Sequence, residues 1–175
     1  KQALVSFGKR SGLFSDIDIR HLGKSLIDPF QLLVKINGPA MNLVDVGYGI
    51  SQVLPIVYQM QHARQYAAFL LQQPEVHLHP RAQAELGTLF AQVAARTSPP
   101  YVIVETHSDY IIDRLRIEIQ EGRLKSDNVT IVFFRRGSHD TAVQNIYFTE
   151  SGELLDPPAD FRSFFLEEHS RLLGV

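Results

Sequence analysis

Three polar residues follow a short apolar run and could support phosphate chemistry. Gln72, Gln73 and Glu75 come directly after residues 69–71, which have the composition of a buried strand. A site that cleaves phosphate needs an oxygen ligand for hydrated Mg²⁺ and a carboxylate that orients or deprotonates the attacking water. A glutamine accepts a hydrogen bond, but it carries no charge and cannot be a general base. Glu75 is the only carboxylate in this segment.

A second polar cluster, residues 105–109, follows the next apolar run at residues 101–104. It contains His107, and a histidine at the end of a strand can hydrogen-bond a terminal phosphate and respond to its presence. A competing chemistry is also open, because His77 and His79 stand at alternate positions. The two histidines could bind a metal ion together with other potential ligands, namely His107, Asp109 and Glu75. The protein would then be a metal-dependent hydrolase.

A glycine-bearing loop precedes both clusters. Gly47 and Gly49, followed by Ser51 and Gln52, open a predicted helix over residues 50–63, and backbone N–H groups at such a helix start are suited to binding phosphate. Residues 23–25, Gly-Lys-Ser, look like the end of a phosphate-binding P-loop. They are not one, because the position that requires the earlier glycine is Asp18.

Alternating strands and helices position these residues. The hydrophobic periodicity predicts helices over residues 50–63, 80–95, 110–120 and 161–173, and strands over 15–21, 30–36, 66–71, 101–104, 129–134 and 142–149. From residue 66 onward the alternation predicts an α/β fold with parallel strands, and the apolar run at 66–71 predicts a strand buried on both faces. Ligands of such sheets bind at the carboxyl ends of the strands, where both polar clusters fall.

Composition narrows the class of protein. The chain has 175 residues, 45% hydrophobic and 21% charged, as expected for one globular domain. A net charge of −2 gives no global positive field for nucleic acid, and the absence of cysteine excludes disulfides and fits a reducing, cytoplasmic location. No apolar run reaches the ~18–20 residues of a membrane span. The start at Lys1 suggests a fragment that begins within a domain.

A family resemblance rests on three stretches in this order, which are residues 42–55, 73–80 and 105–108. The chain resembles the ABC-type AAA ATPases related to the OLD, RecF and SMC proteins. Within that group it is similar to the bacterial subfamily with a small C-terminal domain of unknown function, on the strength of residues 156–161. The resemblance implies the C-terminal part of a P-loop ATPase head, with a mainly parallel sheet, over residues 1–127. It implies the final strands and the small domain over residues 128–175.

The resemblance also implies roles for the candidate residues, with ATP and Mg²⁺ as cofactors. The signature loop, which contacts the γ-phosphate of ATP on the opposite head, would contain Gly47, Gly49, Ser51 and Gln52. The Mg²⁺-binding Walker B position would be Gln72, and the catalytic-glutamate region would contain Gln73 or Glu75. His79 would lie near the D-loop, and His107 would be the switch histidine.

Two departures from the family pattern bear on activity. The Walker A half is absent from the sequence, so an N-terminal half that carries Walker A is an expected partner. Gln72 stands where the family usually has Asp or Glu. The resemblance further implies a homodimer of heads, a nuclease or toxin partner, and a role with DNA or in anti-phage defence. The alternative that Gln72 and Gln73 favour is a catalytically inactive ATPase-like assembly module.

Overall fold

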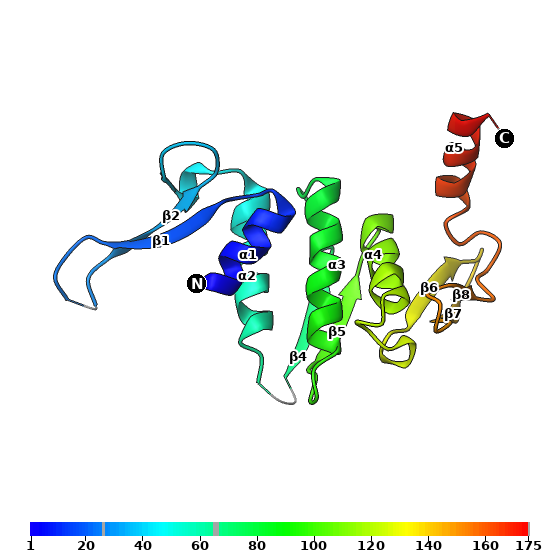
Figure 1. The fold of residues 1–175 in the computed structure, drawn as a ribbon. Helices are drawn as coiled ribbons and strands as arrows, with labels where there is room; N and C mark the ends of the chain where they lie inside the picture. The colour runs from blue at the N-terminus through cyan, green and yellow to red at the C-terminus, as the bar shows by residue number, and fades with distance from the viewer. Residues whose placement is uncertain (26, 65–66, 175) are drawn as a thin grey trace. The chain divides into compact units, whose positions relative to one another are not determined.

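The computed structural model describes residues 1–25, 27–64 and 67–174. The chain divides into two compact units, Lys1–Arg114 and Leu115–Val175. Figure 1 shows the helices and strands of both units. This division falls within one helix, and the predicted domain boundary at residue 127 stays a prediction. No helix among the described residues is long and apolar enough to cross a membrane.

A small antiparallel sheet and two helices begin the first unit. Strands β1 (Asp16–His21), β2 (Phe30–Lys35) and β3 (Met41–Asn42) pair in that order, and a 3₁₀ turn, Leu43–Asp45, leads into helix α2 (Tyr48–Gln61). The sequence patterns did not predict the first helix, α1 (Gln2–Ser11), which ends at Gly12 with a left-handed φ of 75°. These elements enclose an apolar core, made by Phe14, Ile17, Val34, Ile50 and Leu54.

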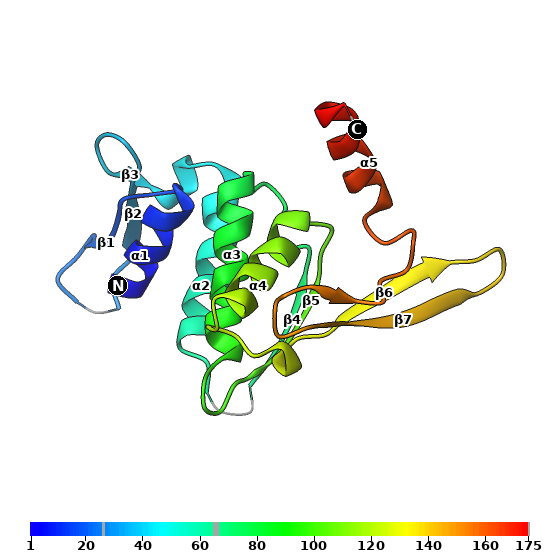
Figure 2. The same cartoon turned by 45° about the vertical axis from the view of Figure 1, so that its right-hand side comes forward.

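A parallel strand pair forms the rest of the first unit. Strands β4 (Ala68–Gln72) and β5 (Tyr101–Glu105) are parallel, with helix α3 (Pro80–Ala94) between them in the chain and helix α4 (Asp109–Gln120) after them (Figure 2). This pairing confirms the strand–helix–strand prediction, except for Tyr66, which lies outside the described residues. Pro80 occupies the first helical turn of α3, where its missing N–H is not needed.

The prediction that the strand at 66–71 is buried on both faces is wrong for the described residues. Leu70 is 75% exposed, and its register partner Ile103 on β5 is 64% exposed. Alternate residues of both strands, such as Phe69 and Val102, are partly buried. The reason is the small size of this sheet, which has two strands in the described part of the chain and is covered on one face.

The second unit contains a separate antiparallel sheet. Strands β6 (Ile131–Arg136), β7 (Thr141–Phe148) and β8 (Leu154–Leu155) pair in that order, after a 3₁₀ turn at Ser126–Asn128, and helix α5 (Ser163–Leu173) ends the chain. The predicted third parallel strand at 129–134 is therefore wrong. The short connection from β6 to β7, closed where the Gly137 N–H donates to the Asp140 carbonyl at 2.9 Å, forces an antiparallel return. Among the described residues, parallel pairing is limited to β4 and β5, so the sheet is not mainly parallel.

An ion pair between a buried glutamate and a half-exposed arginine joins the end of α4 to the segment that follows it. The Glu118 carboxylate is 1% exposed and accepts a hydrogen bond from Arg123 Nε at 2.5 Å. That hydrogen bond raises the pKa of Arg123 above its usual value. A buried carboxylate needs such a partner, because an unpaired charge in an apolar surrounding is strongly unfavourable.

Candidate functional site

The two predicted polar clusters meet where β4 and β5 end. Gln72 and Glu105 are register partners at the last position of the parallel pair, and the Gln73 N–H donates to the Glu105 carbonyl at 2.8 Å. The segments that follow β4 and β5 then leave the sheet at the same edge. Residues 73–79 and 105–109 therefore lie side by side, which is where an open α/β sheet binds its ligands.

A tight turn after β4 directs Glu75 into the protein. Gln73 and His77 have left-handed φ angles of 44° and 66°, which are uncommon for residues other than glycine. Within the turn the Val76 N–H donates to the Gln73 carbonyl at 3.2 Å, and the Leu78 N–H donates to the Glu75 carbonyl at 2.9 Å. Glu75 is only 7% exposed as a result, whereas Val76 and His77 face outward.

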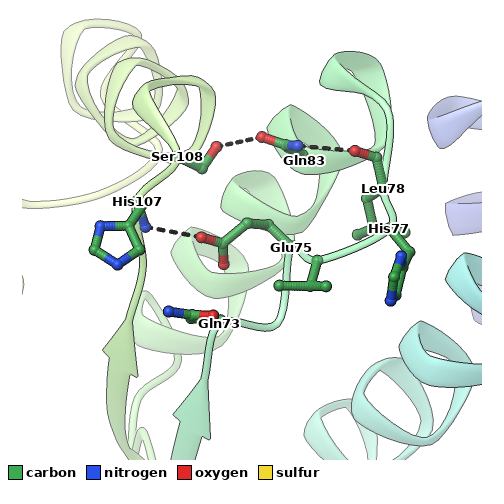
Figure 3. A pocket seen from close by; sticks show the side chains of 8 residues that line it. Gln73, Glu75, His77, Leu78, Gln83, His107 and Ser108 are labelled. Atoms are coloured by element: carbon green, nitrogen blue, oxygen red, sulfur yellow. Dashed lines mark hydrogen bonds between the residues drawn. The ribbon is translucent and has the colours of Figure 1, made fainter.

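The Glu75 carboxylate connects the turn to the end of β5. Its Oε1 accepts a hydrogen bond from Thr106 Oγ1 at 2.7 Å. The same oxygen accepts another from the His107 backbone N–H at 2.8 Å, drawn as a dashed line in Figure 3. Its Oε2 is buried and has no hydrogen-bond partner among the described residues. Buried carboxylate oxygens are rarely left unpaired, so this atom is an unusual feature of the site.

A second connection runs through Gln83 of α3, a residue that no sequence pattern singled out. Gln83 Nε2 donates to the Leu78 carbonyl at 2.8 Å, and Gln83 Oε1 accepts from Ser108 Oγ at 2.6 Å (Figure 3). The same Ser108 oxygen accepts the Ile111 N–H at 3.2 Å and so caps α4, a role for which serine is well suited. Gln83 was missed because its role depends on two loops that meet only in the folded chain.

These connections surround a shallow pocket of about 290 Å³. Of the sequence candidates, Gln73, Glu75 and His107 line it, whereas Gln72 and His79 do not. Gln72 is exposed at the end of β4, and His79 is the residue before α3. The remaining pocket residues come from the turn, from α3 and from the start of α4, and they are Val76, His77, Leu78, Gln83 and Ser108.

The glycine loop lies against the same turn. Gly49 is buried in the first turn of α2, and a Cβ placed on it would stand 2.6 Å from the His77 backbone oxygen. Gly47, the residue before α2, has open space around it, and the Tyr48 and His77 rings lie 5.8 Å apart. The predicted signature loop and the turn after β4 are thus in contact through Gly49. Its other predicted members, Ser51 and Gln52, lie on the first turns of α2, where the Ser51 hydroxyl donates to the Tyr48 carbonyl at 3.0 Å.

The histidines do not assemble into a metal centre. In the part of the chain that the structure describes, no group of three or more His, Cys, Asp or Glu residues could hold a metal ion. Figure 3 shows His77 and His107 on opposite sides of Glu75. The metal-dependent hydrolase alternative therefore has no geometric support.

Comparison with known proteins places this arrangement in a class. A family model described as "AAA domain, putative AbiEii toxin, Type IV TA system" matches residues 6–113, more than half of the chain. The chain belongs to this AAA domain family. A search of curated proteins finds no match.

Solved SMC ATPase heads share the fold. One is an SMC ATPase studied for ATP-driven dimerization and DNA-stimulated activation, with a TM-score of 0.59 and 10% identity over 97% of this chain and 89% of that one. Another is an Smc head bound to the C-terminal winged-helix domain of ScpA, with a TM-score of 0.54 and 13% identity over 83% of this chain. The chain spans 43% of that Smc head. At these identities the likeness shows the fold alone, which is that of SMC ATPase heads.

Proposed function

We propose that this chain is the part of an ABC-type ATPase head that contributes the signature loop, the Walker B strand and the switch histidine. Combined with a Walker A half and a second head, it binds and hydrolyses ATP. The observation that carries this proposal is the pocket at the carboxyl ends of β4 and β5, which brings Gln73, Glu75 and His107 together. Family membership and the head fold support it.

Each group at the strand ends has a chemical task under this proposal. The His107 ring hydrogen-bonds the γ-phosphate, and the Gln73 amide orients the attacking water without removing its proton. Gly47 and Gly49 present the start of α2 to the phosphate on the opposite head. A hydrated Mg²⁺ would be held by the Gln72 amide oxygen at the end of β4. Bound Mg²⁺ would neutralise phosphate charge.

Partners follow by analogy with the SMC relatives. One relative dimerises on ATP and is activated by DNA, and another binds ScpA, so a second head and DNA are the partners we propose first. The family description mentions a toxin system, which favours an anti-phage role beside a nuclease or toxin. Assignment to the OLD and RecF group and a cytoplasmic location belong to the same proposal.

ATP turnover by the complete protein tests this function. The complete ATPase, that is, this chain with its Walker A half, should bind ATP and release phosphate. Residues 1–175 alone serve as the negative control, because they contain no Walker A motif. If the complete protein does not bind ATP, the proposal is refuted.

An inactive assembly module is the second candidate. It is favoured by the two neutral side chains, Gln72 and Gln73, at the positions where the relatives' chemistry needs charge. ATP binding and head association without any phosphate release would support this candidate over the first.

A further inference from the structure

We propose that Glu75 is a positioning residue, whose carboxylate holds the His107 segment in place and does not serve as the general base. The effect of Glu75 on ATP turnover rests on the proposed function. The positioning of the His107 segment by Glu75 rests on the geometry of this chain alone, and separate experiments measure the positioning and the turnover.

Both hydrogen bonds of the Glu75 carboxylate are made to the segment that follows β5, one to a side-chain hydroxyl and one to a backbone N–H. Oε1 receives both Thr106 Oγ1 and the His107 N–H, which uses its two acceptor sites. A general base must lie within hydrogen-bond reach of the water whose proton it takes. Oε2, the oxygen left for that task, is buried, so water in the pocket does not reach it in this structure.

Glu75 also closes a ring of hydrogen bonds around the pocket. Thr106 Oγ1, which donates to Glu75, accepts the Ser108 N–H at 3.0 Å. Ser108 Oγ donates to Gln83 Oε1, and Gln83 Nε2 donates to the Leu78 carbonyl. The Leu78 N–H donates to the Glu75 carbonyl, which completes the ring. Each bond fixes the donor or acceptor of the next, so the ring holds its members in one arrangement.

His107 is the residue that this ring positions. Its own N–H is bound by Glu75, and its two chain neighbours, Thr106 and Ser108, are both members of the ring. The His107 side chain itself is exposed. A group that must meet a phosphate oxygen has to be held within about 0.5 Å of its productive position, which the ring can provide and a free loop cannot.

Two variants separate positioning from acid–base chemistry. Glu75→Gln keeps the length of the side chain and an oxygen that can accept both hydrogen bonds, but it removes the charge. Glu75→Asp keeps the charge, but it is shorter by one carbon–carbon bond, about 1.5 Å, and cannot reach both donors. A positioning role therefore predicts that Gln works better than Asp, and a general base predicts the reverse.

The first measurement is hydrogen–deuterium exchange of residues 105–109 in the complete ATPase, followed by mass spectrometry. Glu75→Gln should exchange at the wild-type rate, and Glu75→Asp about tenfold faster, the equivalent of one net hydrogen bond. Circular dichroism of both variants checks that they are folded. Equal, wild-type exchange in both variants would overturn the proposal.

The second measurement is ATP turnover with ATP affinity measured alongside. The proposal predicts the order of the two variants: Glu75→Asp should have a kcat about tenfold below that of Glu75→Gln at unchanged ATP affinity, matching the loss of one hydrogen bond. An active Asp variant beside an inactive Gln variant would identify Glu75 as the base and overturn the proposal. If the wild type itself releases no phosphate, the proposed function fails, and the exchange rates alone decide the role of Glu75.

Discussion

The two glycines at the start of α2 have opposite surroundings, which predicts opposite effects of the same substitution. A Cβ on Gly49 would lie 2.6 Å from the His77 backbone oxygen, and the next nearest atom would be in the Leu78 side chain at 3.2 Å. A Cβ on Gly47 would meet nothing within 4 Å. We therefore expect Gly49→Ser to destabilise the protein and Gly47→Ser to leave its stability unchanged.

The expected loss for Gly49→Ser follows from the nature of the contact. The clash is with a backbone carbonyl, so the turn or the helix has to move, and overpacking of this kind costs about 1–3 kcal/mol. Serine regains about 0.5 kcal/mol over glycine from its better helix propensity. The net loss is about 0.5–2.5 kcal/mol, or about 1–10 °C in Tm for a chain of this size. Gly47→Ser introduces a favoured N-cap residue, so its change should stay within about 0.5 kcal/mol.

Thermal and urea unfolding of both variants in the complete protein would measure these differences, with the wild type as reference. Sedimentation with and without ATP would then assign the glycines. Gly47→Ser should keep its stability and lose ATP-driven association, because the new side chain occupies the space proposed for the phosphate. A stability loss for Gly47→Ser equal to that of Gly49→Ser would refute the reasoning from the contact at His77.

Three further substitutions test other parts of the site. His77→Val should lose about 1–2 kcal/mol, because a β-branched residue is strained at a φ of 66°, whereas His77→Asn, which loses the same ring contact with Tyr48, should stay within about 0.5 kcal/mol in urea unfolding. Gln72→Glu should raise kcat in the complete ATPase by restoring a charged ligand, and unchanged turnover would remove Gln72 from the Walker B position. His107→Ala should lower kcat about 100-fold with ATP affinity nearly constant, and an equal loss of both would make the histidine structural.

The sequence predicted the elements that carry the site, but not their packing. Helices α2, α3 and α4 and the parallel pair β4–β5 were all expected, because their apolar periodicity is strong and their ends carry Pro80 and Ser108. The strand β6 was assigned to the wrong sheet. Local patterns identify a strand, whereas the partner of that strand is set by the short loop that follows it and by tertiary contacts.

The inward direction of Glu75 was also beyond the sequence. A carboxylate three residues after a strand is ordinarily solvated, whereas the turn with left-handed Gln73 and His77 directs this one into the protein. Glutamine does not favour that conformation and histidine adopts it only occasionally, so no strong turn signal marks it. The surrounding hydrogen bonds over-determine the turn, which is how strained backbone persists at functional sites.

The closed ring and the two glutamines together favour a head that holds ATP over one that consumes it quickly. Carboxylates at positions 72 and 73 would repel the triphosphate until Mg²⁺ neutralised them, and neutral amides remove that repulsion together with the base. The ring keeps His107 in place, so the phosphate contact requires little reorganisation. Under the proposed function the ATP-bound, associated state is then long-lived. Under the same proposed function, we expect release from that state to depend on an outside event.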